Sequence, residues 1–518
     1  MIQNPILRGF CPDPSIIRVG EDYYIATSTF EWWPGVKLFH SKDLKHWEQI
    51  PSPLRRTSQL NLIGDPASGG VWAPCLSHDG KRFYLTYTDV KTKKGRFYNT
   101  HNYVVWTEDI YGDWSEPAYF NSIGFDPSLF HDVDGRKYLI NMVNGFKGIL
   151  VQEVAPDSLR LIGERRKVYA GSGIGCTEGP HVYHIGDWYY LLTAEGGTGY
   201  DHCVTLARSR SIWGPFETAP SNPILTSDRE DPEALQKAGH ADLVETQNGE
   251  WYLVHLCSRP VSGRKLCTLG RETAIQKMEW DGDGWLRLKG GGNYARMSAE
   301  EPEGIPERPL ENEEQGFLDE FMKPELSVRY SSPRSPMEAF TDLGARKGYL
   351  RMTGRESLNS LHNVSLLAVR QQRISCAVET AVEFHPEYPE QVAGITYVYD
   401  CMNYYIFGKT VNEKGVPVLI LLKSDTGAVS DEMEPVPIPG NGEVRLRILV
   451  GDEGLGVTFY YQTEAQDWKQ AGGMQTTEIL TDEHCRGFTG AHFGLYVHDL
   501  TGLSLSADFR YFKLWGTD

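Results

Sequence analysis

The sequence predicts an all-β protein in which a five-bladed β-propeller is followed by a C-terminal β-sandwich of the jelly-roll or concanavalin-like kind. Three observations predict this fold. A segment centred on Pro in four copies and on Asp in the fifth recurs within residues 1–298, an acidic and Pro-rich stretch follows, and the rest of the chain alternates apolar and polar residues without a long helical pattern. At 518 residues the chain is long enough for two large domains.

Each repeat joins a Pro-centred segment to a turn and an aromatic strand. The units read PDPSIIRVGEDYYIATS, WAPCLSHDGKRFYLTYT, FDPSLFHDVDGRKYLINMV, TEGPHVYHIGDWYYLLTA and HADLVETQNGEWYLVHLC. Counted from Pro14 through Pro74, Pro127, Pro180 and Asp242, the spacings are 60, 53, 53 and 62 residues. A unit of this length has room for four strands, and such a sheet buries both faces only when neighbouring sheets pack around an axis. Residues 1–298 are therefore expected to form five blades.

A change in composition marks the end of the repeats. Residues 299–315 read AEEPEGIPERPLENEEQ, which is acidic, Pro-rich and without periodicity, as is typical of a linker. Beyond it, segments such as VRLRILVG and GVTFYYQT alternate between apolar and polar residues, which predicts strands. We expect residues 316–518 to form the β-sandwich.

Charge and composition exclude several functions. The formal net charge is −18, and the longest cluster of basic residues is KTKK at 91–94, so nucleic acid is not an expected partner. The nine cysteines are odd in number and lack CxxC pairs, which fits a reducing compartment better than a disulfide framework or a zinc site. The N-terminus has no leader pattern and no run of 18 apolar residues occurs, so we expect a cytoplasmic protein without membrane association.

Three carboxylates occupy matching places in the repeats. Asp13 and Asp126 each stand directly before the proline of their unit, and Glu178 stands two residues before Pro180. The innermost strands of a propeller line its channel, so these side chains are expected to converge. An Asp before Pro can simply close a turn, but three acids gathered at one point raise each other's pKa and indicate a function. Glycoside hydrolysis needs a carboxylic acid as proton donor and a carboxylate that activates water, and a third acid can tune the donor.

At these residues the sequence resembles glycoside hydrolase family 43, and within it the two-domain β-xylosidases. CPDPS, GFDPSLFHD and TEGP stand where that family carries its base, its pKa modulator and its acid, and WAPCL, GHADLVE and LGRETA also match. The resemblance implies that Asp13 is the general base, Asp126 the pKa modulator and Glu178 the general acid. It further implies an exo-acting, inverting enzyme that releases D-xylose from the non-reducing end of short β-1,4-xylo-oligosaccharides, and a homo-oligomer, either a dimer or a tetramer.

The resemblance also assigns binding residues. Phe30 and Trp72 resemble the aromatic walls of the terminal-sugar site, Arg271 resembles the arginine that holds the sugar hydroxyls, and Phe488 resembles an aromatic residue that the sandwich extends over the site. Each has a plainer alternative: Trp72 can be core, and Arg271 can pair with an acid at the rim.

His240 and Phe146 are the two assignments that depend most on context. His240 matches a channel histidine near a bound divalent cation, usually calcium, in some relatives, although a lone histidine there is more often a hydrogen-bonded core residue. No cofactor is otherwise required. The segment NMVNGFKGILVQ is shorter than its counterpart in many family members, so we expect Phe146 to supply the missing stacking surface, and aglycone specificity near residues 144–148 stays open.

Three alternative functions remain. An α-L-arabinofuranosidase of the same family, or a bifunctional enzyme, fits the same residues because the two pentoses present similar hydroxyl patterns. A fructosidase predicts an NDPNG-like start and an RDP segment, where this chain has CPDPS and GFDPS. A sugar-binding propeller without catalysis predicts loss of the acids, which are intact.

Overall fold

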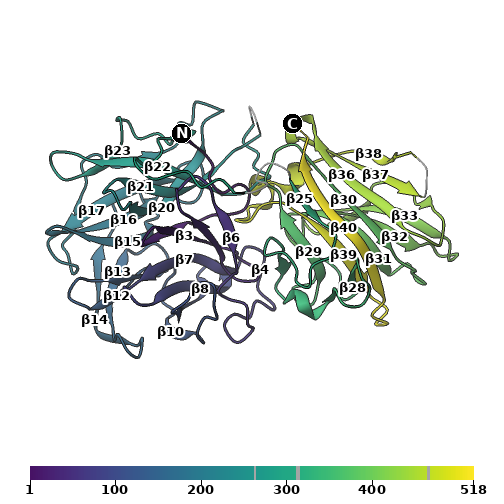
Figure 1. The fold of residues 1–518 in the computed structure, drawn as a ribbon, viewed down its shortest axis with the longest axis horizontal. Coiled ribbons are helices and arrows are strands. Elements are labelled where there is room, and N and C mark those ends of the chain that lie inside the picture. Colours follow the sequence, from purple (N-terminus) through teal and green to yellow (C-terminus); the bar gives the residue numbers. More distant parts are fainter. Residues whose placement is uncertain (262–263, 311–315, 464–466, 518) are drawn as a thin grey trace.

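The computed structural model describes residues 1–261, 264–310, 316–463 and 467–517, and it contains two all-β domains that lie side by side (Figure 1). The propeller occupies the purple-to-teal half of the chain, and the sandwich occupies the green-to-yellow half. The predicted fold class is confirmed. Residues 311–315 of the predicted linker and the last residue of the chain lie outside the described residues.

Each propeller blade is an antiparallel sheet whose principal strands pair in chain order. Blade one contains β2 (Ser15–Val19), β3 (Asp22–Thr27), β5 (Lys37–Ser41) and β6 (Glu48–Ile50). Blade two contains β7 (Gly70–His78), β8 (Phe83–Lys94), β9 (Phe97–Thr107) and β10 (Ala118–Asn121). Blade three contains β11 (Ser128–His131), β12 (Lys137–Met142), β13 (Ile149–Val154) and β14 (Leu161–Tyr169).

The last two blades follow the same plan. Blade four contains β15 (Glu178–Ile185), β16 (Trp188–Glu195), β17 (Cys203–Ser209), β18 (Glu217–Thr218) and β19 (Leu225–Thr226), with β18 and β19 both paired to β17. Blade five contains β20 (Gln236–Glu245), β21 (Trp251–Ser258), β22 (Glu272–Trp280) and β23 (Leu286–Leu288). The turns between the first two strands use glycine where the backbone turns left-handed, as at Gly80 (φ +91°) and Gly135 (φ +85°).

The N-terminal segment closes the ring of blades. Strand β1 (Ile2–Gln3) pairs with β24 (Ser298–Ala299), and Ala299 is the first residue of the predicted linker. Leu7 and Thr273 of β22 exchange two backbone hydrogen bonds of 3.1 Å. The first residues of the chain are therefore joined to the last blade, which removes a free edge.

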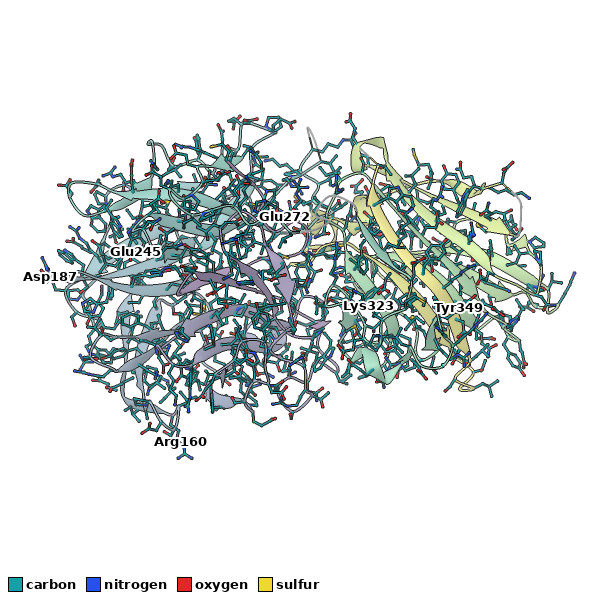
Figure 2. All side chains as sticks on the ribbon, viewed as in Figure 1. Arg160, Asp187, Glu245, Glu272, Lys323 and Tyr349 are labelled. Atoms are coloured by element: carbon teal, nitrogen blue, oxygen red, sulfur yellow. The ribbon has the colours of Figure 1, made fainter. Side chains whose placement is uncertain are left out.

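Apolar side chains fill the spaces between blades. Trp47 and Trp114, which follow charged residues in the outer parts of their blades, are 9% and 3% exposed, and Trp213 is partly buried against the core between blades three and four. These tryptophans serve as packing residues. Charged side chains such as Arg160 and Asp187 lie at the outer rim (Figure 2), whereas Glu272 is fully buried near the second domain and pairs with Arg259 at 2.7 Å.

The sandwich consists of two antiparallel sheets. One sheet contains β25 (Phe317–Asp319), β27 (Thr341–Asp342), β28 (Leu350–Thr353), β30 (Cys376–Glu383), β36 (Val444–Gly451), β37 (Gly456–Thr463), β38 (Lys469–Thr476) and β40 (Ser506–Gly516). The other contains β29 (Ser365–Arg370), β31 (Gln391–Val398), β32 (Tyr404–Val411), β33 (Pro417–Asp425), β34 (Ala428–Asp431), β35 (Val436–Pro437) and β39 (His492–Asp499).

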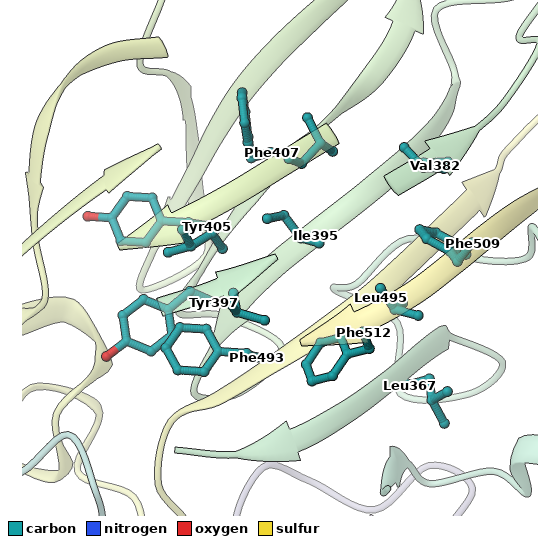
Figure 3. Close-up of a cluster of buried hydrophobic side chains, with 14 of the residues drawn as sticks. Leu367, Val382, Ile395, Tyr397, Tyr405, Phe407, Phe493, Leu495, Phe509 and Phe512 are labelled. Carbon is teal, nitrogen blue, oxygen red and sulfur yellow. The ribbon is translucent and has the colours of Figure 1, made fainter. Parts of the chain in front are cut away.

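One apolar core lies between these sheets (Figure 3). Val382, Phe509 and Phe512 from the first sheet pack in the same cluster as Ile395 and Phe493 from the second. Strand β36 alternates as predicted, because every second residue of VRLRILVG, beginning with its first valine, is buried.

Helical structure in the described residues is limited to short turns. They are η1 (Met337–Ala339), η2 (Asp452–Gly454), η3 (Glu478–Leu480) and α1 (Asp482–Cys485). Within the described ranges, none of the helices combines the length and apolar character that crossing a membrane requires.

The two domains share strand pairing and an apolar cluster. Strand β4 (Trp32–Trp33) of the propeller pairs with β26 (Ser332–Pro333) of the sandwich. Phe10, Phe30 and Trp32 belong to the same buried cluster as Leu366 and Tyr496. The sandwich is thus packed directly against the blade-one loop that carries Phe30.

Candidate active site

The three predicted carboxylates meet in one pocket. Asp13 and Asp126 each lie two residues before the inner strand of their blade, and they share a left-handed backbone with φ of 54° and 53°. Glu178 is the first residue of β15. Trp72 on β7 and His240 on β20 stand at the same place in their repeats as Glu178, so all five blades contribute to the pocket.

The pocket is a cavity of about 250 Å³, and all nine predicted site residues line it. Its lining consists of Asp13, Phe30, Trp72, Ala73, Lys93, Tyr98, Phe125, Asp126, Phe146, Glu178, Thr198, His240, Arg271 and Phe488. A larger hollow of about 610 Å³ is lined by residues of all five inner strands, but none of the three acids is among them. The chemistry therefore identifies the smaller cavity as the site.

Asp13 is surrounded by groups that favour its charged form. Ser28 donates a hydrogen bond of 2.6 Å to Oδ2, the Arg271 guanidinium lies 3.2 Å from Oδ1, and His240 Nδ1 lies 3.7 Å from the same oxygen. Burial acts to raise the pKa of Asp13, but Arg271, His240 and Ser28 together lower it below its usual value. Asp13 is therefore a carboxylate that can accept a proton.

Asp126 and Glu178 are in the opposite situation. Burial and the negative charge of Asp13 raise the pKa of Asp126, and burial with the charges of Asp126 and Asp13 raises the pKa of Glu178 well above its usual value. Asp126 Oδ2 accepts a hydrogen bond of 3.0 Å from the backbone N–H of Gly179, which favours its ionised form. We infer that the proton of this pair resides on Glu178.

Aromatic rings form the walls. The ring centroids of Phe30, Trp72 and Phe488 lie 5.9 to 6.2 Å from one another, so these three rings form a continuous surface. Phe125 extends it, because its ring lies edge-on to Trp72 at 5.2 Å and to Phe146 at 6.1 Å. Such a surface suits the apolar faces of a sugar ring, and the carboxylates in the same pocket can supply polar contacts.

The sandwich provides one wall through the segment that follows α1. Phe488 lines the pocket, and its backbone carbonyl accepts a hydrogen bond of 2.8 Å from Arg271. Lys237 of β20 anchors α1, which directly precedes this segment, through ion pairs of 3.1 Å with Asp482 and 2.8 Å with Glu483. Arg271 thus connects Asp13 of the propeller with the sandwich.

His240 lies in a buried environment that disfavours its charged form. Burial lowers its pKa to about 4, although Asp13 opposes the effect. Among the described residues no group of three or more His, Cys, Asp or Glu side chains is arranged to hold a metal ion, and the Arg271 guanidinium also faces Asp13. These side chains alone do not form a cation site, and the predicted calcium ion near His240 stays a prediction.

Several lining residues were not identified from the sequence. Phe125 stands at the start of the third repeat and Ala73 lies in WAPCL, so comparison of repeat positions was the signal available for both. Lys93 and Tyr98 lie on either side of the turn between β8 and β9, the two longest strands of the propeller. Thr198 follows β16, and no motif marks it.

Comparisons with known proteins agree with this geometry. Residues 2–286 match the family model described as Glycosyl hydrolases family 43, and residues 318–514 match the Beta xylosidase C-terminal Concanavalin A-like domain. The chain is 44% identical over 532 residues to Xylosidase/arabinosidase 43B of Humicola insolens, which covers 99% of this chain and 97% of that protein. It is 43% identical to Beta-xylosidase of Bacillus subtilis (strain 168), with 99% of each covered.

A solved structure is similar over the same length. The crystal structure of xylan beta-1,4-xylosidase from Bacillus Halodurans C-125 superposes with a TM-score of 0.96 at 47% identity, covering 99% of this chain and 100% of that one. The resemblance drawn from CPDPS, GFDPSLFHD and TEGP is confirmed. This chain belongs to family 43 of the glycosyl hydrolases.

Proposed function

We propose that this protein is an exo-acting, inverting glycoside hydrolase that releases D-xylose from the non-reducing end of short β-1,4-xylo-oligosaccharides. The proposal is carried by the opposite pKa shifts of Asp13 and Glu178, which line one aromatic pocket. The names of the relatives from Bacillus subtilis and Bacillus Halodurans support a β-xyloside substrate.

Glu178 is proposed as the general acid. It donates its proton to the glycosidic oxygen as the bond from that oxygen to the anomeric carbon breaks, so the departing sugar leaves as a neutral alcohol. Asp126 keeps this proton in place near neutral pH, because its negative charge adds to burial in raising the pKa of Glu178.

Asp13 is proposed as the general base. It takes a proton from a water molecule while the water oxygen bonds to the anomeric carbon on the face opposite the departing oxygen. Ser28 and Arg271 hold the two carboxylate oxygens of Asp13 and so fix its orientation. Solvent then removes the proton from Asp13 and restores the proton on Glu178. Inversion at the anomeric carbon follows from the single displacement.

The shape of the pocket supports exo action. A cavity of about 250 Å³ with the sandwich on one side suits the end of a short chain better than the middle of a polymer. We propose that Phe30, Trp72 and Phe488 stack against the terminal sugar, that Arg271 and His240 contact its hydroxyls, and that Phe146 faces the departing sugar.

α-L-Arabinofuranosidase activity is the second candidate. The Humicola insolens relative is named for both activities, and the same acids would serve either pentose. A sugar-binding protein without catalysis is disfavoured because all three acids are present in the pocket.

Release of 4-nitrophenol from the β-D-xylopyranoside and the α-L-arabinofuranoside tests the proposal, with wild type compared to Asp13→Ala and Glu178→Ala. Xyloside turnover that is lost in Asp13→Ala and reduced in Glu178→Ala is the expected result. Greater turnover of the arabinofuranoside would favour the second candidate. No turnover of either substrate, or variants as fast as wild type, would contradict both the substrate class and the site.

Two further predictions concern the whole protein. The cytoplasmic location and the homo-oligomeric state, a dimer or a tetramer, stay predictions. Cell fractionation tests the first, and light scattering during size-exclusion chromatography tests the second.

A further inference from the structure

Glu31 is a buried acid that the mechanism above does not use. It is 2% exposed and follows the pocket residue Phe30, at the junction where the two domains meet. Its backbone carbonyl accepts a hydrogen bond of 2.8 Å from the N–H of Arg334 in the sandwich, and the Arg334 guanidinium acts electrostatically on its carboxylate. A buried carboxylate is costly unless it is hydrogen-bonded, so its partners indicate its role.

The carboxylate of Glu31 holds the peptide of Ser68. Oε2 accepts a hydrogen bond of 2.9 Å from the Ser68 N–H. Ser68 is 2% exposed and has a left-handed backbone with φ of 58°, which is strained for a residue with a side chain. Two glycines follow it, and Gly70 also has a positive φ of 73°. A segment of this composition keeps one conformation only when its surroundings fix it.

Ser68 in turn accepts hydrogen bonds from three residues that line the pocket. Its Oγ accepts a hydrogen bond of 2.9 Å from the backbone N–H of Phe488. Its carbonyl oxygen accepts hydrogen bonds of 3.0 Å from Trp72 Nε1 and 3.1 Å from Lys93 Nζ. Phe488, Trp72 and Lys93 all line the pocket, and the Lys93 ammonium lies 4.4 Å above the Phe488 ring.

We propose that Glu31 is a positioning residue for the sugar pocket: by holding the Ser68 peptide, it fixes Trp72 and Lys93 of the propeller together with Phe488 of the sandwich. Glu31 contacts neither the acids nor, in this account, the substrate. The kinetic part of this inference rests on the proposed function, whereas the positioning itself is a property of the folded protein.

Glu31 can hold the Ser68 peptide in either protonation state. Burial raises the pKa of Glu31 to about 7, and the positive charge of Arg334 opposes the rise. Both the ionised and the protonated carboxyl retain an oxygen that can accept the Ser68 N–H. We therefore expect the acceptor oxygen, rather than the negative charge, to be the feature that positions Ser68.

A matched pair of variants tests this. Glu31→Gln keeps an acceptor oxygen, whereas Glu31→Met has similar size and lacks one. Asp400→Asn is the control, because Asp400 lines the same small junction cavity but its Oδ1 accepts from the backbone N–H groups of Met402 and Asn403. Ser68→Ala removes only the hydroxyl that receives the Phe488 N–H.

The first readout is hydrogen exchange at the Phe488 amide, which needs no substrate. Exchange is expected to be at least tenfold faster in Glu31→Met and Ser68→Ala, and near the wild-type rate in Glu31→Gln and Asp400→Asn. The second readout is kcat/KM on the nitrophenyl xyloside, where Glu31→Met is expected to lose about tenfold and Glu31→Gln less than threefold, with the limbs of the pH profile unmoved.

The outcomes separate the two claims. The positioning role is overturned if the Phe488 amide exchanges no faster in Glu31→Met than in Asp400→Asn. It is also overturned if this amide exchanges at the wild-type rate in Ser68→Ala. If Glu31→Met does not fold, the Ser68→Ala result still decides whether Ser68 holds Phe488. A wild-type protein that hydrolyses neither nitrophenyl glycoside overturns the proposed function, while the exchange comparison still decides the positioning.

Discussion

The propeller and the sandwich bury their apolar residues in different ways. Within the described residues, the propeller distributes its core among separate clusters between neighbouring blades, whereas the sandwich places a single cluster between its two sheets. Blades that pack side against side leave their inner ends around an axis, where polar groups can gather. Among the described residues, the sandwich contributes Phe488 to the pocket, from the segment between α1 and β39.

Strained backbone occurs in both domains, but among the described residues it lines the pocket only in the propeller. Asp13, Asp126 and His240 have positive φ and line the pocket. In the sandwich, positive φ occurs in exposed segments at Thr426 and Ser504 and in buried ones at Phe321 and Arg334. Strained backbone at a buried site has to be held by its surroundings, so the packing of the blades has to hold these site residues in place.

The largest expected effect comes from the base. Asp13→Asn keeps the shape of the side chain and removes the proton acceptor, so kcat should fall by about 10³-fold or more on both nitrophenyl glycosides. Steady-state kinetics measure the change, and circular dichroism melting checks that the fold is intact. A folded variant that retains more than a tenth of wild-type kcat would show that another group activates the water.

The acid should show a loss that depends on the leaving group. Glu178→Gln cannot donate a proton, and a sugar alkoxide needs that proton far more than 4-nitrophenolate does. We expect kcat to fall by about 10³-fold on xylobiose and by about 10²-fold or less on the nitrophenyl xyloside. Equal losses on the two substrates would contradict the role of Glu178 as acid.

A pair of substitutions in the sandwich separates positioning from stability. Phe488→Ala removes a pocket wall and should lower kcat/KM by about tenfold or more, with little change in the free energy of unfolding. Leu446→Ala in the sandwich core leaves a cavity and should lower that free energy by about 2–5 kcal/mol without changing kcat/KM. Urea denaturation and kinetics on both variants make the comparison, and a reversed pattern would mean that the sandwich has another part in catalysis.

The smallest effect concerns pH. Activity requires Asp13 ionised and Glu178 protonated, so kcat/KM should fall at low pH as Asp13 gains a proton and at high pH as Glu178 loses one. Asp126→Asn removes a negative charge that raises the pKa of Glu178, so the alkaline limb should move to lower pH by about one unit. An alkaline limb that stays in place or moves to higher pH would exclude Asp126 as the modulator.

The repeats explain why so much of the propeller site was predictable. Asp13, Asp126 and Glu178 could be placed together because the register of the inner strands repeats from blade to blade. The two aspartates accordingly have nearly the same φ. Phe488 followed from the resemblance alone, since no periodicity in the sequence connects a sandwich loop with a propeller channel.

Other residues were beyond prediction for a physical reason. Lys93 and Tyr98 reach the pocket because β8 and β9 are long, and strand length is weakly encoded in local sequence. The contact between Glu31 and Ser68 depends on a left-handed serine in a turn, which is a conformation that tertiary packing imposes.

The central claim is that Asp13 activates water for a single displacement while Glu178 protonates the departing oxygen. Proton NMR of the xylose first released from 4-nitrophenyl β-D-xylopyranoside tests it most directly. This substrate yields one xylose per turnover, and the two anomers of xylose give separate signals before mutarotation mixes them. α-Xylose is expected to appear first. If β-xylose appears first, the reaction proceeds with retention, and the assignment of Asp13 as a base acting on water is wrong.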